Sequence, residues 1–289
     1  MTKRRPRSLG SRPAGRYNER VSEHRFLPDA NRVSVLAAVV LLAYALTRLF
    51  ETPHFPFAVS LAGISFSFDV NLNLAVAFLA AGLTATGTDW LLRSHPAFKR
   101  NAFEHWLLPA LTAWGISFPL YTLPSGIFWW LAFGLGGSLL VLVFLAEYVV
   151  VDPMDERYAI AAAVLTALSF VLFFVLTISM RFTGVRLFVQ LPVLSIAAGL
   201  VALRTLHLRL GGRWELNWAS GIALVTAQLA AAWHYWPLAP VQYALVLFAP
   251  VYGATALAVS LGEDVPARRA LVDPLVVLAV LWGLALGIR

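Results

Sequence analysis

Cysteine is absent from this chain of 289 residues, and charged side chains are scarce. Without cysteine there can be no disulfide, thiolate nucleophile, iron–sulfur cluster or cysteine zinc site. Only 13% of the residues are charged and 60% are hydrophobic, whereas an ordinary soluble domain is about 25% charged. The apolar residues form runs of about 18 to 25, the length that crosses a bilayer. The composition therefore excludes a soluble globular or disordered chain and predicts an integral membrane protein.

Lysine is also rare, and most of the net charge of +7 comes from arginines near the N-terminus. Residues 1–32 are polar and cannot bury enough apolar surface to fold alone, so we expect a disordered basic cytoplasmic tail. Residues 33–289 then form a single polytopic transmembrane domain. Topology and contact with anionic lipid headgroups explain such a tail. We expect no specific nucleic-acid binding, because the tail lacks interleaved aromatic residues and a recognisable fold.

The apolar runs predict an all-α membrane protein, a bundle of about nine transmembrane helices. Continuous apolar runs exclude a membrane barrel, whose strands alternate, and helices satisfy their own backbone in lipid. The expected spans are 33–50, 70–92, 105–122, 126–151, 157–180, 186–206, 217–235, 239–262 and 270–288. The run 105–122 contains Pro109 and Pro119, so a kinked or re-entrant segment is the alternative there.

The distribution of basic residues predicts the orientation. With the N-terminus inside, eighteen of the 22 Lys and Arg residues lie on the cytoplasmic side of nine spans. The positive-inside rule then places the N-terminus in the cytoplasm and the C-terminus outside. The corresponding location is the bacterial cytoplasmic (inner) membrane.

Residues 57–70 have a different pattern from the spans. Apolar and small or polar residues alternate with period two on both sides of Ala62-Gly63. This alternation is typical of a β-hairpin with glycine in the turn, and we expect a small extracytoplasmic lid on the helix ends. An irregular interfacial loop is the alternative.

The weak candidates for catalytic residues are Asp89, Arg93, Glu104 and His105. Asp89 and Arg93 are four residues apart, so on a helix they share a face and can pair. Glu104 and His105 open the next span and can return to the same corner. Together they can form an acid–base or metal-assisted site at the headgroup level, or alternatively a structural salt bridge beside solvated loop charges.

A second polar cluster, around Pro153, is acidic. It contains Glu147, Asp152, Asp155 and Glu156. Carboxylates can hold Mg²⁺, but these have no repeated spacing, so a solvated turn is the simpler interpretation. Asp155 or Glu156 can also pair with Arg204 or Arg209. We predict no metal site and no cofactor, because the chain has no P-loop, dinucleotide fingerprint, His-Glu-x-x-His or Gly-x-Ser-x-Gly.

The middle of the predicted membrane domain lacks ionisable residues, which counts against proton-coupled pumping. Gln190 and Gln228 are its deepest large polar side chains, and interhelical hydrogen bonding is their expected role. The glycines of residues 134–138 lie in an apolar span and indicate close helix packing.

The sequence Gly-Thr-Asp-Trp-Leu-Leu-Arg-Ser-His-Pro at 87–96, followed by His-Trp-Leu-Leu-Pro-Ala-Leu-Thr at 105–112, resembles a family of uncharacterised bacterial polytopic membrane proteins, a domain of unknown function. The resemblance covers Gly87–Thr112 and the general layout of spans. It implies no activity.

Three functions remain open from the sequence. The first is a non-enzymatic integral membrane protein. The second is a transporter or channel for a small or apolar solute, with a cavity near mid-depth lined by groups such as Gln190, Gln228 or Ser169. The third is a membrane-embedded enzyme that acts on a lipid or lipid-linked substrate at the cytoplasmic headgroup level.

Overall fold

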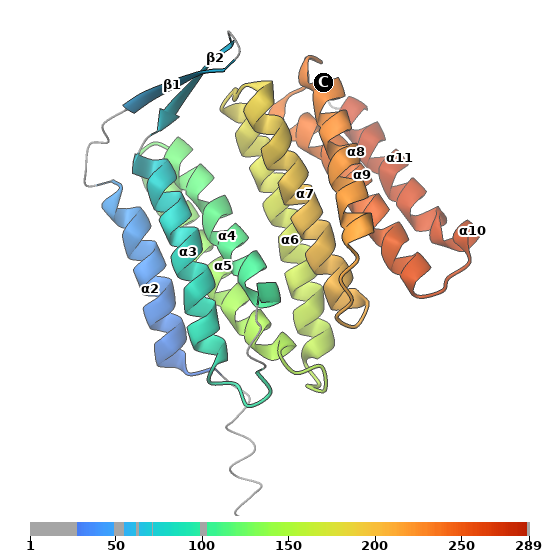
Figure 1. Cartoon of the computed structure of the whole chain (residues 1–289), viewed down its shortest axis with the longest axis horizontal. Helices are drawn as coiled ribbons and strands as arrows, with labels where there is room; N and C mark the ends of the chain where they lie inside the picture. Colours follow the sequence, from blue (N-terminus) through green and yellow to red (C-terminus); the bar gives the residue numbers. More distant parts are fainter. Residues whose placement is uncertain (1–27, 49–54, 62–63, 71, 99–102, 288–289) are drawn as a thin grey trace, which may run out of the picture.

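The computed structural model describes residues 28–48, 55–61, 64–70, 72–98 and 103–287. Long helices lie side by side and alternate in direction (Figure 1). The helices are α2 (Ala30–Leu46), α3 (Leu72–Leu92), α4 (Phe103–Thr122), α5 (Ile127–Val150), α6 (Tyr158–Phe182), α7 (Leu187–Arg209), α8 (Leu216–His234), α9 (Pro240–Gly262), α10 (Ala267–Ala270) and α11 (Val272–Gly287). We call the end where α2 begins the lower end and the opposite one, where α11 finishes, the upper end.

Within the described residues, six helical segments are long and apolar enough to cross a membrane, which is compatible with a multi-pass membrane protein. They are α3 from Ala75, α5, α6, α7, α9, and the stretch Ala267–Gly287 that includes α10 and α11. Many large apolar side chains on these helices are exposed, including Leu79, Leu135 and Ile160. Exposed apolar surface of this extent is expected where lipid replaces water.

The predicted fold class was wrong in its count of about nine transmembrane helices. Helix α2 has 17 residues and is shorter than a span, and neither α4 nor α8 is among the six candidates. Polar residues explain why α4 and α8 are not among the candidates, because α4 begins with Glu104-His105 and α8 contains Asn217 and Gln228. The sequence expectation overestimated how apolar these runs are.

The hairpin region contains two short strands, β1 (Phe55–Leu61) and β2 (Ile64–Val70). They run antiparallel, with Val59 opposite Phe66 and Leu61 opposite Ile64, and form a sheet of these two strands only. The predicted lid on the helix ends is not supported, because the main packing within the described residues joins the strands to each other and helices to helices.

The packed interior falls into two halves joined along one seam. One apolar cluster comes from α2–α5 and includes Val40, Leu140 and Phe144. A second comes from α6–α9 and includes Phe173 and Tyr243. A third cluster, drawn from α4–α7, lies between them. Helix α4 crosses this region as one continuous helix with both prolines inside it, so the re-entrant alternative is not what the structure has.

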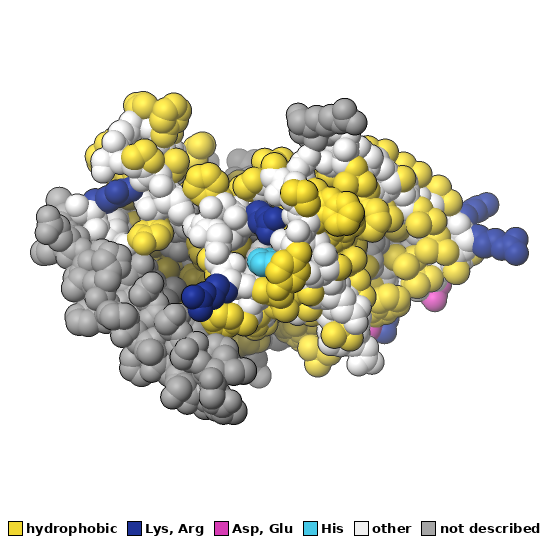
Figure 2. All heavy atoms as spheres, turned by 90° about the horizontal axis from the view of Figure 1, so that it is seen from above, with side chains coloured by type: hydrophobic (Ala, Val, Ile, Leu, Met, Phe, Trp, Pro, Cys, Tyr) yellow, Lys and Arg dark blue, Asp and Glu magenta, His cyan; other side chains and the backbone are white. Residues whose placement is uncertain are grey.

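Two arginines at the upper end cap neighbouring helices. Arg48 donates to the carbonyls of Leu120 and Leu123 at the end of α4, and Arg181 donates to those of His234 and Trp236 after α8. The last carbonyls of a helix have no intrahelical partner, so these contacts satisfy them. Figure 2 looks down on the upper end, where the described side chains are mostly hydrophobic with isolated basic groups.

The glycines of α5 confirm the close packing expected for residues 134–138. A Cβ at Gly136 would lie 2.7 Å from Cγ2 of Ile116 on α4, whereas a Cβ at Gly134 would meet nothing within 4 Å. The two positions are two residues apart on the same helix but face different surroundings.

We predict that Gly136→Leu lowers the free energy of unfolding by about 1–3 kcal/mol, because the added side chain overfills the contact between α4 and α5. Thermal unfolding of the purified protein in detergent measures the effect. Gly134→Leu is the matched control and leaves the unfolding midpoint nearly unchanged. Equal destabilisation by both changes would contradict the packing described here.

Candidate functional site

A buried ion pair joins the two halves of the molecule near the lower end. Glu147 on α5 is fully buried, and its Oε2 accepts a hydrogen bond from Nη2 of Arg204 on α7, which is 2% exposed. The same Oε2 lies 2.7 Å from Nδ1 of His105, at the start of α4. Three helices therefore contribute to one charged cluster inside an otherwise apolar body.

The positions of these residues in their helices explain why they meet. Glu147 is one turn before the end of α5, Arg204 is in the last two turns of α7, and His105 is in the first turn of α4. All three places are at the lower end of the array. Burying either charge alone would cost several kcal/mol, so each side chain constrains the others.

A second layer of polar groups covers this pair. Oε1 of Glu104 lies 3.6 Å from Nε2 of His105, and Oε2 of Glu104 lies 3.5 Å from Nε2 of His207. The ring of His207 packs against Trp214, with 4.5 Å between centroids. Glu104 is thus positioned between two imidazoles that come from different helices.

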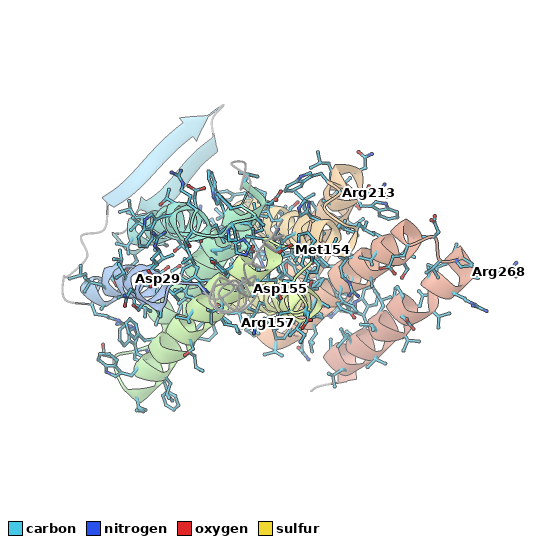
Figure 3. The ribbon with its side chains drawn as sticks, turned by 90° about the horizontal axis from the view of Figure 1, so that it is seen from below. Asp29, Met154, Asp155, Arg157, Arg213 and Arg268 are labelled. Atoms are coloured by element: carbon cyan, nitrogen blue, oxygen red, sulfur yellow. The ribbon has the colours of Figure 1, made fainter. Side chains whose placement is uncertain are left out.

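These groups line a cleft of about 620 Å³ at the lower end. Its walls also include Tyr158 and Arg209, and its rim comes from the loops after α3, α5 and α7. Figure 3 looks at this end and labels Met154 and Asp155 in the α5–α6 loop and Arg213 in the α7–α8 loop. The volume is in the range of small-molecule sites, about 300–1,000 Å³.

Several buried polar atoms in the cluster have no hydrogen-bond partner among the described residues. They are Nε and Nη1 of Arg204, Oε1 of Glu147 and Nδ1 of His207. Buried polar groups are nearly always paired with protein or water. Arg204 and His207 line the cleft, so these unpartnered nitrogens belong to side chains of its polar wall.

A buried histidine, His95, lies behind Ala97, which lines the cleft. His95 is 4% exposed, its Nδ1 accepts a hydrogen bond from the backbone N–H of Ala97, and its ring packs edge-on against Tyr148. Burial lowers the pKa of His95, and the carboxylates of Asp152 and Asp155 act in the opposite direction. The net shift favours the uncharged ring, which is the form that accepts this hydrogen bond.

The structure brings the predicted site residues together in two separate groups. Arg93 Nη2 lies 2.7 Å from Oδ2 of Asp89, the expected pair, but Arg93 is 70% exposed. Glu104 and His105 line the cleft instead, and no described interaction joins them to Asp89 or Arg93. A pair that is exposed on one side contributes little to stability, so Asp89–Arg93 has the features of a helix-end contact.

The sequence interpretation missed the Glu147–Arg204 pair. It grouped Glu147 with a solvated acidic turn and offered Asp155 or Glu156 as partners for Arg204. In the structure Asp155 and Asp152 accept hydrogen bonds from backbone N–H groups of their own loop. The signal in the sequence was the presence of Glu147 and Arg204 inside apolar helices, where an ionisable group needs a partner.

The residues expected to line a mid-depth transport cavity do not converge. Gln190 lies 2.9 Å from the imidazole of His234 near the upper end, as expected for an interhelical hydrogen bond. Gln228 is exposed on α8, and the hydroxyl of Ser169 bonds the carbonyl of Leu165 on its own helix. Within the described ranges, no three His, Asp or Glu side chains gather in a way that could hold a metal ion.

Comparison with protein families matches residues 52–288 to the model described as protein of unknown function, DUF5656. The chain belongs to this family. The match runs from just before β1 to the end of α11, so every helix that lines the cleft lies inside the DUF5656 region. No curated protein and no solved structure matches the chain. Membership of the DUF5656 family indicates no activity, so the cleft is the feature that bears on function.

We predict that Glu147→Gln lowers the free energy of unfolding by about 3–5 kcal/mol, because it leaves Arg204 as a buried charge without its counterion. Chemical denaturation in detergent micelles measures the loss. Glu156→Gln, on an exposed side chain of the following loop, is the control and changes stability by less than about 0.5 kcal/mol.

The double variant Glu147→Leu with Arg204→Leu provides a further check. Because it removes both charges, it should be more stable than Glu147→Leu alone. If the two single changes simply add, the pair is not an interacting unit.

Proposed function

We propose that this protein is a multi-pass protein of the bacterial cytoplasmic membrane that binds an anionic ligand in the lower cleft, in a non-enzymatic role. The observation that carries the proposal is the buried guanidinium of Arg204, which uses one nitrogen for Glu147 and has two without a partner in the described part of the chain. A guanidinium is suited to phosphate and carboxylate oxygens because it offers donors in a planar fork.

The orientation in the membrane is part of this proposal. The lower end is cytoplasmic and the upper end extracytoplasmic, with the basic segment 1–32 on the cytoplasmic side near anionic headgroups. Arg93, Arg157, Arg213 and Arg268 follow or precede helices at the lower end, which supports this assignment. The cleft would then open at the level of the cytoplasmic headgroups.

Reporter fusions test the orientation. We expect a cytoplasmic reporter to be active after Glu156, in the α5–α6 loop, and an external reporter to be active after Pro237 and after Arg289. The reason is that the α5–α6 loop is at the lower end, whereas the α8–α9 loop and the end of α11 are at the upper end. This pattern requires α8, which is not one of the six candidates by apolar composition, to cross the membrane packed against α7. The opposite pattern at all sites would reverse the assignment, and a mixed pattern would contradict the alternation of the helices.

Ligand binding is tested with inorganic phosphate and the purified full chain. Phosphate is expected to raise the unfolding midpoint in a saturable way, adding about 1.4 kcal/mol at ten times its Kd. Sodium chloride at matched ionic strength is the control for screening. The shift should be lost in Arg204→Lys, which keeps the charge but not the fork, and kept in Arg213→Lys.

A second variant keeps the test informative if Arg204→Lys does not fold. Glu104→Gln removes a negative charge from the cleft wall, so phosphate should bind more tightly to it than to the natural chain. Unchanged or weaker binding to Glu104→Gln, or an equal shift with chloride, would overturn the proposal.

An enzyme that acts on lipid headgroups is the second candidate. It is favoured by one observation, that the imidazole of His105 lines the cleft and lies against the carboxylate of Glu147. A carboxylate that orients a histidine is the usual arrangement for a general base. Consumption of a lipid substrate that His105→Asn abolishes while phosphate binding persists would favour this candidate over the non-enzymatic role.

A further inference from the structure

An apolar groove lies on the side of the molecule, between α3, α4 and α7. It encloses about 460 Å³ and is lined by Phe78, Ala81, Ala85, Phe103, Trp106, Leu107, Ala110, Leu111, Trp114, Val193, Ile196, Ala197 and Leu200. All of these side chains are apolar or aromatic. Such a surface accepts hydrocarbon and offers nothing to a charged molecule.

The groove and the cleft lie next to each other along one face of α7. Ile196, Leu200 and Arg204 follow one another at intervals of four residues, and His207 comes three residues later. Residues three and four apart lie above one another on a helix. The first two of these side chains line the groove, and the last two line the cleft.

Helix α4 repeats this arrangement on the facing side. Leu107 and Leu111 line the groove, while Glu104, one turn below Leu107, lines the cleft. A small cavity between the two spaces is bordered by Leu107, Leu111 and Leu200 together with Arg204. A helical turn rises 5.4 Å, and Arg204 comes one turn after Leu200. The side chain of Arg204 in the cleft wall is therefore about one turn from the nearest groove residue of α7.

Two tryptophans in the groove have unused hydrogen-bond donors. The indole N–H groups of Trp106 and Trp114 are buried and have no partner among the residues that the structure describes. A buried indole N–H normally finds an acceptor. Pure hydrocarbon supplies none, so these donors indicate an occupant that carries oxygen atoms near its apolar part.

We infer that the groove and the cleft together form one site for an anionic membrane lipid, with the phosphate-containing headgroup at Arg204 and an acyl chain in the groove. This inference rests on the proposed function and names its ligand class. The observations that select a lipid are the adjacency of the two spaces along α4 and α7, the change from apolar to charged lining within one helical turn, and the indole donors of the groove. An inserted protein helix would cover the groove but would not explain the guanidinium below it.

The test compares two lipids that share chains but differ in headgroup charge. The full chain in mixed nanodiscs of phosphatidylglycerol and phosphatidylcholine with identical acyl chains is released into native mass spectrometry, and retained lipid is counted. We expect phosphatidylglycerol to be retained selectively. Equal retention of the two lipids would overturn the inference.

A matched pair of variants on α3 tests the groove itself. Ala85 lines it, and Ala75 is exposed on the same helix outside the lining. Ala85→Phe should weaken phosphatidylglycerol retention about tenfold by displacing about two buried methylenes, whereas Ala75→Phe should not. If Ala85→Phe and Ala75→Phe retain phosphatidylglycerol equally, the acyl chain of the lipid does not lie in the groove.

The two proposals fail in different ways. If phosphate stabilises the protein through Arg204 but Ala85→Phe leaves lipid retention unchanged, the lipid inference is wrong and the anion site stands. If phosphate has no specific effect and lipid retention is independent of headgroup, both are wrong. Ala85→Phe should leave the phosphate-induced shift of the midpoint intact, because Ala85 does not line the cleft.

Discussion

The ion pair between Glu147 and Arg204 constrains how the two halves of this molecule fit together. Both side chains are buried between apolar helices, and neither charge can be left alone there without a large desolvation cost. Van der Waals contacts along the seam allow many relative positions of α5 and α7. The hydrogen-bonded pair selects one of them, and it also orients His105 from α4.

The same constraint creates the polar end of the cleft. Glu147 accepts a hydrogen bond from one nitrogen of the Arg204 guanidinium, and this bond fixes the whole planar group. The other two nitrogens are therefore held in position although they have no partner among the described residues. Preorganised donors of this kind bind an anion without a further cost of ordering. Glu104 and the two imidazoles beside it adjust the local charge, so the site is not simply a positive surface.

Hydroxyl groups elsewhere show how the helices keep other polar side chains compatible with an apolar interior. Thr84, Thr112, Thr177 and Thr255 are buried, and each hydroxyl donates to the carbonyl four residues earlier on its own helix. These contacts are local and need no neighbouring helix. The charged cluster differs because its partners come from three helices, and the unused donors of Arg204 are therefore a feature of the assembled fold.

The sequence by itself determined the local elements. Continuous apolar runs located α3, α5, α6, α7 and α9 to within about three residues. A spacing of four residues identified Asp89–Arg93 because Arg93 directly follows α3 and its backbone N–H still bonds the carbonyl of Asp89. The pairing of Glu147 with Arg204, and the position of Glu104 and His105 in a cleft and not in the Asp89 corner, became visible in the assembled helices. Helical periodicity specifies which residues share one face of a helix. Which other helix packs against that face depends on side-chain contacts between residues 42 to 57 positions apart in the sequence.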